Sequence, residues 1–368
     1  MKKYFQSLVG PHLPFVHLRL KSGLKNVILD LFFHPIKRRI AKLYVYILQN
    51  YFGLTVIGIT GSAGKTTTKE MLAGILKLKG NTVWSKENID SVFNIPSTIL
   101  KCFIDTKYLI LEMGVEYPHE MDFYLWLVRP IIGVVTNVFP THTEFFGDEK
   151  GVAGEKGKLI SSLPENGFAV LNSSNILTKD MAKLAKSKVY YFDTNVDPTI
   201  QNSNTAKKVA EILKVSNDLI DKGLKTYQNP KHRLFQFQHQ SGAIILDDSY
   251  NSNPEATLST LRVFNKLAGN NKKIAVLGDM LELGKLEEGE HRRVGKEVSK
   301  SKFDVVIGVG ILSRYLIDEV KKSKSKTFLV NDQKEVLSIL LPLLSKDTYV
   351  LIKGSRSIGL DKLIDKLV

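Results

Sequence analysis

Short apolar runs alternate with longer amphipathic segments from residue 55 to the end of the chain. Four runs rich in aliphatic and β-branched residues come first, at 55–60, 108–113, 131–138 and 168–172. The segment 65–80 carries apolar residues at helical spacing and ends on a glycine. Buried strands that alternate with amphipathic helices are typical of a parallel sheet covered on both faces. The pattern therefore predicts an α/β fold.

A second series of the same kind follows the Pro- and Asn-containing break "YQNPKH" at 227–232. Its apolar runs lie at 243–249, 272–280, 304–310, 326–330 and 348–355. The segments between them are charged and helical in pattern, which favours a second, Rossmann-like α/β domain. We expect three parts: a leader at 1–54, a first α/β domain at 55–230 and a second at 231–368.

The leader concentrates the positive charge of the chain. The formal net charge is +15, and residues 1–54 hold nine Lys and Arg against Asp30 alone. The runs "NVILDLFF" and "IAKLYVYILQNYF" have helix-like spacing, so the leader is either a basic amphipathic helix on an anionic membrane or a helix packed on the body with its basic face in water. It has no apolar run long enough to span a bilayer and no cleavable signal pattern. No nucleic-acid reader motif accompanies the charge, so no nucleic acid partner is expected.

Cys102 is the single cysteine and lies in the apolar run "TILKCFI". One cysteine excludes an internal disulfide, which fits a reducing cytoplasm. We expect a buried thiol without a chemical role, and a cytoplasmic protein that is either free or peripheral at the inner membrane face.

The stretch "TGSAGKTTTKE" at 60–70 predicts a phosphate-binding loop. The usual pattern G-x-x-x-x-G-K-[ST] would place its first glycine at Ile59, whereas the glycine present is Gly61, so the loop is two residues shorter. A strand precedes the loop and a helix follows it, which directs backbone N–H groups and the helix dipole at one point. Lys65 is then placed for the terminal phosphates of a nucleotide and Thr66 for Mg²⁺. The alternative is an incidental Gly-Lys-Thr turn.

Two further residues follow predicted strands. Glu112 ends the apolar run "YLILEM", where a carboxylate suits Mg²⁺, although solvated glutamates are common at strand ends. His142 lies in "NVFPTHTEFFG" after the third strand, at the sheet edge where open α/β sheets bind ligands, although a lone histidine is more often structural. Lys156 follows fourteen residues later in "GEKGKL".

These motifs together resemble the Mur ligases, ATP-dependent amide ligases that build the peptidoglycan peptide, and within them the branch that adds D-alanyl-D-alanine. The resemblance covers about 55–368 and rests on the short loop, "LILEMGVEYPHEM", "VVTNVFPTHTEFFG", "NPKHRLFQF", "LDDSYNSNPEA", "VLGDMLELG" with His291, and "KGSR". It implies a central P-loop domain with a parallel sheet and a Rossmann-like C-terminal domain. It also implies ATP, two Mg²⁺ ions and a carbamylated lysine at Lys156, since a carbamate can ligate a cation and an ammonium cannot.

The resemblance assigns roles residue by residue. The residues expected at the nucleotide are Gly61, Ser62, Ala63, Gly64, Lys65, Thr66, Thr67, Asn204, Arg233 and Asp248. Those expected at the metal ions are Thr66, Glu112, His142 and Lys156, and the catalytic set is Lys65, His142 and Lys156. Those expected at the substrate are Asn88, Tyr250, Asn251, Asn253 and Arg356.

The departures from the family pattern fall on the acyl substrate. Only the 54-residue leader stands where the family carries a UDP-binding domain, and "NIDSVFNIP" keeps Asn88 and Pro96 of the substrate loop while Asp90, Ser91 and Asn94 differ. We expect an acyl phosphate made from ATP and then captured by an amine, which is D-Ala-D-Ala or a similar amine added to a muropeptide-like acid. The alternatives are a ligase for a lipid-linked or pseudomurein-like acid, and a non-catalytic nucleotide-binding scaffold.

Overall fold

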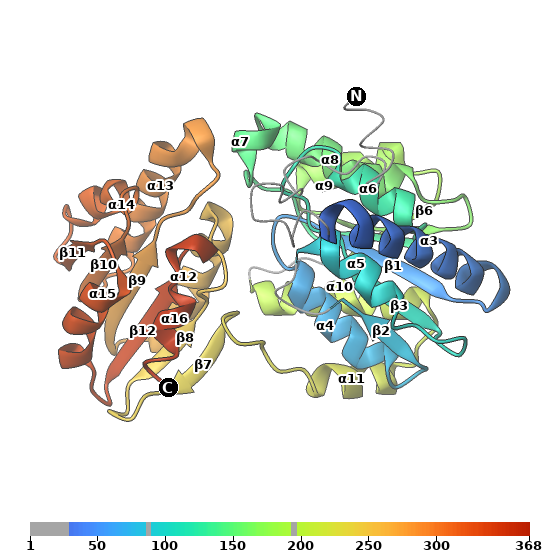
Figure 1. The fold of residues 1–368 in the computed structure, drawn as a ribbon. Coiled ribbons are helices and arrows are strands. Elements are labelled where there is room, and N and C mark those ends of the chain that lie inside the picture. The colour runs from blue at the N-terminus through green and yellow to red at the C-terminus, as the bar shows by residue number, and fades with distance from the viewer. Residues whose placement is uncertain (1–28, 86–89, 193–196) are drawn as a thin grey trace. The chain divides into compact units, whose positions relative to one another are not determined.

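The computed structural model describes residues 29–85, 90–192 and 197–368, and the chain divides into two compact units, Met1–Tyr227 and Gln228–Val368. Each unit has its own six-stranded sheet in the described residues (Figure 1). The α/β class predicted from the alternating pattern is confirmed. None of the helices in these residues is long and apolar enough to cross a bilayer.

The sheet of the first unit is parallel throughout, with the order β2-β3-β1-β4-β5-β6. In that order the strands are Thr82–Trp84, Tyr108–Glu112, Thr55–Thr60, Ile132–Val135, Phe168–Asn172 and Lys188–Phe192. The chain leaves β1 toward one side of the sheet and enters β4 on the other. The carboxyl ends of β1 and β4 therefore flank a topological switch point, where open α/β sheets bind ligands.

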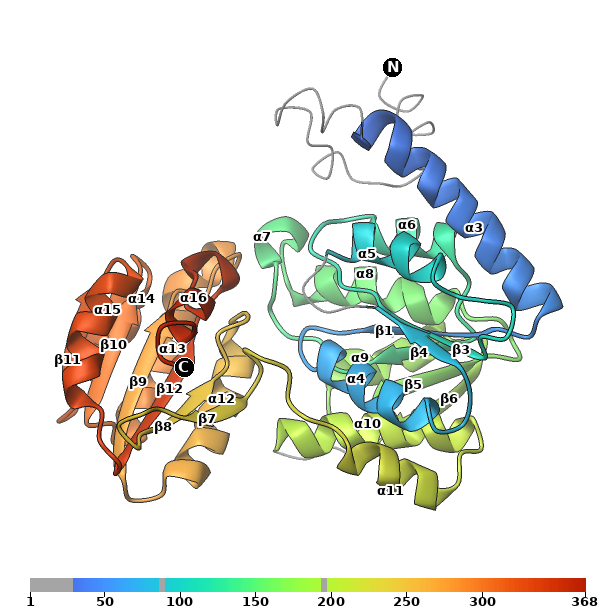
Figure 2. The same cartoon turned by 60° about the horizontal axis from the view of Figure 1, so that its bottom comes forward.

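Helices cover both faces of this sheet, as the near-continuous apolar strands require. The helices of the unit are α3 (His34–Tyr51), α4 (Lys65–Leu76), α5 (Ser91–Ile99), α6 (Glu120–Leu127), α7 (Thr143–Phe146), α8 (Glu149–Ser161), α9 (Ile176–Asp180), α10 (Pro198–Ile212) and α11 (Asn217–Lys225). Helices α4, α10 and α11 pack on one face, and α3, α5, α6 and α8 lie on the other (Figure 2). Alternate residues of β1 divide between the two cores: Val56 joins the first, and Ile57 and Ile59 join the second.

Helix α3 is part of the first unit. It follows a π-helical turn at Leu29–Phe33, and Ala41, Val45 and Leu48 are buried in the core beneath it. The described part of the leader is therefore a helix packed on the body, one of the two expected forms. Its outward face differs from the basic face that this form predicted, because apolar side chains such as Ile40 and Leu43 point to solvent.

The second unit has a sheet in the order β11-β10-β9-β12-β8-β7, in which only the β7–β8 pair is antiparallel. In that order the strands are Lys326–Val330, Val305–Val309, Lys272–Gly278, Thr348–Lys353, Ile244–Asp247 and Phe235–Gln238. The helices are α12 (Pro254–Ala268), α13 (Glu287–Lys300), α14 (Ser313–Val320), α15 (Gln333–Leu340) and α16 (Asp361–Ile364). Short 3₁₀ turns lie at Met181–Leu184, Gly284–Leu286, Leu341–Leu343 and Arg356–Ile358.

Candidate active site

The glycine loop connects β1 to α4, and its two glycines cannot be replaced by another residue without strain. Gly61 has φ 145° and Gly64 has φ 81°, which lie in the region that favours glycine. A Cβ on Gly61 would overlap with the Thr136 hydroxyl, and a Cβ on Gly64 would overlap with Oδ1 of Asn202 on α10. The short loop is therefore a tightly packed feature in which Gly61 is the leading glycine.

The segment after β4 holds the loop in shape. The N–H of Ser62 donates to the Asn137 carbonyl at 3.0 Å, and the N–H of Ala63 donates to the Asn137 side-chain oxygen at 2.8 Å. The Thr136 hydroxyl donates to the Ala63 carbonyl at 2.6 Å. The loop is thus fixed across the switch point before a nucleotide arrives, and the first turn of α4 presents its dipole to an anion there.

Thr66 and Glu112, both predicted at the metal ions, come together beside the loop. The Thr66 hydroxyl donates to Glu112 Oε1 at 3.0 Å, and the ammonium of Lys69 lies 3.3 Å from Glu112 Oε2 and 3.2 Å from Glu70 Oε1. The backbone of Glu112 is held on both sides, because its N–H donates to Ser85 and its carbonyl accepts from the Ser91 hydroxyl. A hydroxyl and a carboxylate side by side are hard oxygen donors that fit Mg²⁺.

Lys156 is buried in α8, with 1% of its surface exposed. Burial lowers the pKa of its ammonium well below the ordinary value, and the neighbouring charge of Lys65 lowers it further, while Glu120, Glu155 and Glu116 oppose the shift. Lys156 therefore shares an electrostatic environment with the lysine of the glycine loop. The neutral amine is the form that reacts with carbon dioxide, and a lowered pKa favours that form, so the chemistry of this position fits a carbamate.

His142 occupies the cap position of α7 in the left-handed conformation, with φ 57° and a half-buried side chain. In the ranges 29–85, 90–192 and 197–368, no three His, Cys, Asp or Glu side chains are grouped so as to hold a metal ion. A metal here would consequently need oxygen ligands of other kinds. The Thr66 hydroxyl and a modified Lys156 are of that kind, and the role of His142 stays a prediction.

Helix α10 brings to the loop an asparagine that the sequence analysis did not single out. Asn202 is buried, and its side-chain oxygen accepts from the Thr68 hydroxyl at 3.4 Å and covers Gly64. Asn204, predicted to lie at the adenine, is half-buried on the same helix. Its contact with the base stays a prediction. Asn88, predicted to bind the substrate, lies outside the described residues.

In the second unit, Asp248 anchors the loop after β8. Its carboxylate accepts from the Lys353 ammonium at 2.6 Å, from the Thr260 hydroxyl at 2.6 Å and from the N–H of Leu234 at 3.2 Å. Three donors already stabilise this anion, which gives Asp248 a structural role of its own. The predicted contact of Asp248 with ribose stays a prediction.

Two guanidinium groups lie over one aromatic ring at the same end of this sheet. The guanidinium carbon of Arg233 lies 3.9 Å from the centroid of the Tyr250 ring, and that of Arg356 lies 4.8 Å from it. Arg233 Nε is buried and has no hydrogen-bond partner in the part of the chain that the structure describes. Two cations held around a ring, one with a spare donor, form a site suited to an anion such as a phosphate or a carboxylate.

Other predicted residues of this unit have structural roles. Asn253 caps α12 by accepting from the N–H of Ala256 at 2.9 Å, and the Asn251 carbonyl accepts from Lys353 at 3.0 Å. His291 is buried, accepts from the N–H of Met280 through Nε2 at 3.0 Å and donates through Nδ1 to the Glu287 carbonyl at 2.7 Å. His291 thus links the segment that follows β9 to α13, and burial lowers its pKa.

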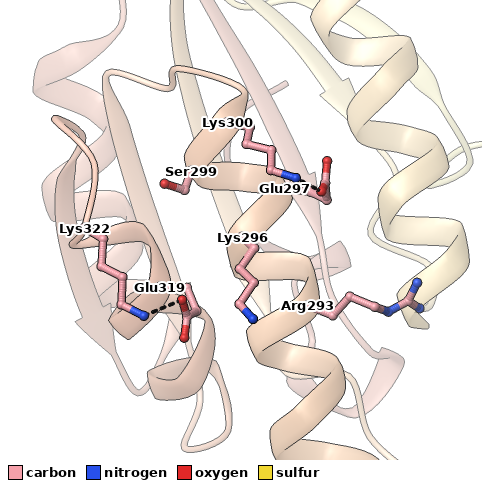
Figure 3. Close-up of a pocket in the computed structure, with 7 residues that line it drawn as sticks. All are labelled: Arg293, Lys296, Glu297, Ser299, Lys300, Glu319 and Lys322. Atoms are coloured by element: carbon pink, nitrogen blue, oxygen red, sulfur yellow. Dashed lines mark hydrogen bonds and ion pairs between the residues drawn. The ribbon is translucent and has the colours of Figure 1, made fainter.

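A hollow of about 330 Å³ also lies between α13 and α14. It is lined by Arg293, Lys296, Glu297, Ser299, Lys300, Glu319 and Lys322 (Figure 3). Two of its four cations, Lys322 and Lys300, each lie 2.6 Å from a glutamate of the lining, Glu319 and Glu297. The hollow contains none of the residues described above, so it is not a candidate for their chemistry.

Sequence reasoning missed four residues at these sites. They are Lys69, Asn137, Asn202 and Lys353. Lys69 had a local signal, because a helix that follows a glycine loop buries its inner face, and Lys69 lies one helical turn beyond Lys65. The other three join segments more than 70 residues apart in the chain, and a pattern read along one sequence does not reveal such pairs.

Comparison with known proteins agrees with this geometry. The profile of the Mur ligase middle domain matches residues 59–222, and that of the Mur ligase glutamate ligase domain matches residues 232–356. The UDP-N-acetylmuramoyl-tripeptide–D-alanyl-D-alanine ligase of Buchnera aphidicola is 28% identical, over 94% of this chain and 82% of that protein. The Escherichia coli enzyme of that name is also 28% identical, over 85% of this chain and 76% of its own.

Solved structures lead to the same family. A crystal structure of MurF from Acinetobacter baumannii superposes with a TM-score of 0.80 at 25% identity and covers 90% of this chain and 80% of its own. The MurF ligase of Thermotoga maritima, solved with ADP, shares the fold with a TM-score of 0.78 at 24% identity, over 90% of this chain and 83% of its own. The profiles, the relatives and the short glycine loop with Thr66 and Glu112 at its side agree: the chain belongs to the Mur ligase family.

Proposed function

We propose that this chain is an ATP-dependent ligase that joins D-alanyl-D-alanine to a peptidoglycan precursor tripeptide, the reaction for which its relatives are named. The observation that carries the proposal is the preformed loop with Thr66 and Glu112 in contact beside it and the buried amine of Lys156 in the electrostatic environment of Lys65. Phosphoryl transfer depends on positioned cations more than on covalent chemistry, and this arrangement concentrates them.

The residues of the first unit have separate tasks in the transfer. The loop amides and the Lys65 ammonium bind the terminal phosphates and stabilise the charge that develops on them. Lys65 donates to the Gly61 carbonyl at 2.9 Å, so it exchanges this weak intraprotein bond for a phosphate. Thr66 and Glu112 would hold Mg²⁺, which supplies a Lewis acid for the phosphate oxygens when bound. His142 is proposed as a further ligand.

Lys156 is proposed to act as its carbamate. The Nζ lone pair attacks the carbon of carbon dioxide, a C–N bond forms, and the proton leaves to solvent. The product is an anion beside the Lys65 cation, so the repulsion that lowers the pKa of Lys156 becomes an attraction. The carbamate oxygens would then be ligands for a second Mg²⁺ at the acyl carboxylate. Carbon-13 NMR with labelled bicarbonate detects such a carbamate directly, and Lys156→Ala should lack the signal.

The second unit would position the amine and the phosphates of the nucleotide. Arg233 and Arg356 around Tyr250 are proposed to bind anionic groups, with Asn204 at the adenine and Asp248 at the ribose. Asn88, Asn251 and Asn253 are proposed to border the substrate. The predicted peripheral contact of residues 1–54 with a membrane, in a cytoplasmic enzyme, is a proposal of the same kind, and α3 supplies the surface for it.

A phosphate-release assay tests the function. UDP-N-acetylmuramoyl-tripeptide, D-alanyl-D-alanine and ATP together should give phosphate and ADP, and omission of the acid or the amine should abolish turnover. Lys65→Ala should lower turnover by about 10²–10³-fold, the range for one electrostatic contact to the transition state. Lys183→Ala, which removes an exposed surface lysine, is the matched control. Turnover with a lipid-linked or pseudomurein-type acid alone would reassign the substrate, and nucleotide binding without turnover for any acid would identify a scaffold.

A further inference from the structure

The outward face of α3 is apolar along its length. Ile36, Ile40, Leu43 and Ile47 recur at spacings of three and four residues, so they share one face, and each is exposed. Leu43 has 63% of its surface in contact with solvent. The opposite face packs in the core through Ala41, Val45 and Leu48, so the helix is apolar on both sides. Figure 2 shows the course of α3 along the first unit.

A neighbouring loop extends this surface. Tyr44 of α3 donates its hydroxyl to the Cys102 carbonyl at 2.7 Å, which places the next two residues, Phe103 and Ile104, beside the helix. Phe103 is 68% exposed. We call the set formed by Ile36, Ile40, Leu43, Ile47, Phe103 and Ile104 the apolar strip. Contiguous exposed apolar side chains of this kind mark an interaction site, because isolated ones are the ordinary case on a protein surface.

Basic side chains border the apolar strip. Helix α3 carries Lys37, Arg39 and Lys42 outside the core and has no acidic residue. Its fourth cation, Arg38, is buried and lies over the rings of Phe93 and Phe123. Arg39 is exposed, and Lys101, next to the loop, is exposed as well. Asp105 is the acidic residue of that loop, and its carboxylate accepts from the Asn81 side chain at 3.1 Å. The sequence at 1–28 adds five Lys and Arg and no acidic residue.

We propose that the apolar strip docks the protein on an anionic lipid bilayer, with α3 parallel to the membrane plane. An apolar stripe between flanking cations is the pattern of helices that lie in the interface, where apolar side chains enter the acyl boundary and cations meet the headgroups. A second copy of this chain is a poorer occupant, because a symmetric contact would place the cations of α3 against each other without an opposing anion. The docking is independent of the ligase reaction, and its test does not require turnover.

Flotation of the full chain with vesicles tests the docking. The protein should float with vesicles of phosphatidylglycerol and phosphatidylcholine, and weakly or not at all with phosphatidylcholine alone. The triple variant Ile36→Ser, Ile40→Ser, Leu43→Ser should bind at least about tenfold more weakly, and Arg39→Gln with Lys101→Gln should reduce the dependence on anionic lipid. The control is Ile176→Ser with Ile311→Ser, which removes apolar side chains that are 77% and 71% exposed elsewhere.

A second measurement remains informative if the triple variant does not fold. Burial raises the pKa of the Cys102 thiol to about 12, so a cysteine introduced as Leu43→Cys is the one that a thiol-reactive, polarity-sensitive dye modifies. The dye should shift to the blue on anionic vesicles, and a dye at Ile311→Cys should not. No flotation of the wild-type chain, equal flotation of the triple variant, or a wild-type dimer that the triple variant loses would each overturn the proposal, the last in favour of a second copy.

Discussion

Gly64→Ala tests how far the shape of the glycine loop depends on contacts from α10. Gly64 has φ 81°, and a left-handed conformation costs a residue with a Cβ about 1–2 kcal/mol. The new Cβ would also overlap with Asn202 Oδ1, and such overpacking costs about 1–3 kcal/mol. The two contributions lower the free energy of unfolding of the first unit by about 2–5 kcal/mol, unless the loop moves and gives up its phosphate site.

Asn202→Ala in the same chain separates the two contributions. It removes the overlap and leaves the backbone strain, so the double variant should recover about 1–3 kcal/mol relative to Gly64→Ala. Gly154→Ala in α8 is the control, because that glycine is helical and nothing lies within 4 Å of the added Cβ. It should be neutral or stabilise the unit by up to about 1 kcal/mol.

Denaturant titration followed by tryptophan fluorescence measures this effect, since Trp84 and Trp126 are the two tryptophans of the chain and both lie in the first unit. Titration with a fluorescent ATP analogue measures the phosphate site in parallel. A Gly64→Ala chain with wild-type stability and wild-type nucleotide affinity would refute the reasoning. No recovery in the double variant would refute the part assigned to Asn202.

Three further outcomes are expected. Lys69→Met removes the cation that lies 3.3 Å from Glu112, so the free energy of unfolding of the first unit should fall by about 1–3 kcal/mol without Mg²⁺. Added Mg²⁺ should stabilise the variant by more than it stabilises the wild type. Equal stabilisation of the two chains by Mg²⁺ would contradict this. Burial lowers the pKa of His291 below its ordinary value of 6.5, so the unfolded state binds more protons than the folded state below about pH 6.5. The stability of the second unit should therefore decline as the pH falls below that value. His291→Gln should flatten this pH dependence in thermal melts, and an unchanged slope would assign the dependence to another group. Arg356→Ala should weaken the binding of the anionic ligand of the second unit by about tenfold in calorimetry, because one charge-assisted bond is lost. Arg314→Ala removes an exposed arginine of α14 and should leave the affinity unchanged.

The sequence pattern located the strands that carry the site and missed those that do not. The runs at 55–60 and 168–172 coincide with β1 and β5, because buried parallel strands are almost wholly apolar. β2 has three residues, and β6 lies at the sheet edge with Lys188 and Tyr191 exposed, so neither has an apolar run to detect. The amphipathic leader was recognised, but which of its faces would be buried depends on the body beneath it.

The candidate site divides in the same way. Gly61 and Glu112 could be singled out because each stands at a strand end, and Thr66 because it follows the Gly-Lys pair that opens α4. Asn202 was missed, since only the packing of α10 against α4 decides which side of the helix meets the loop. The structural role of Asp248 could not be predicted for a similar reason, because its partner Lys353 lies on a strand about a hundred residues later in the chain.

Asn137 has a consequence for how sequences of this kind can change. One residue fixes Ser62 and Ala63 through its carbonyl and its side-chain oxygen, and the chain reaches His142 five residues later. An inserted or deleted residue between Asn137 and His142 would displace His142 relative to the glycine loop, because the hydrogen bonds of Asn137 hold that loop in place. Length variation among homologous chains should therefore accumulate outside 137–142, and grafting this segment with its glycine loop as one block should preserve the geometry that either piece alone would lose.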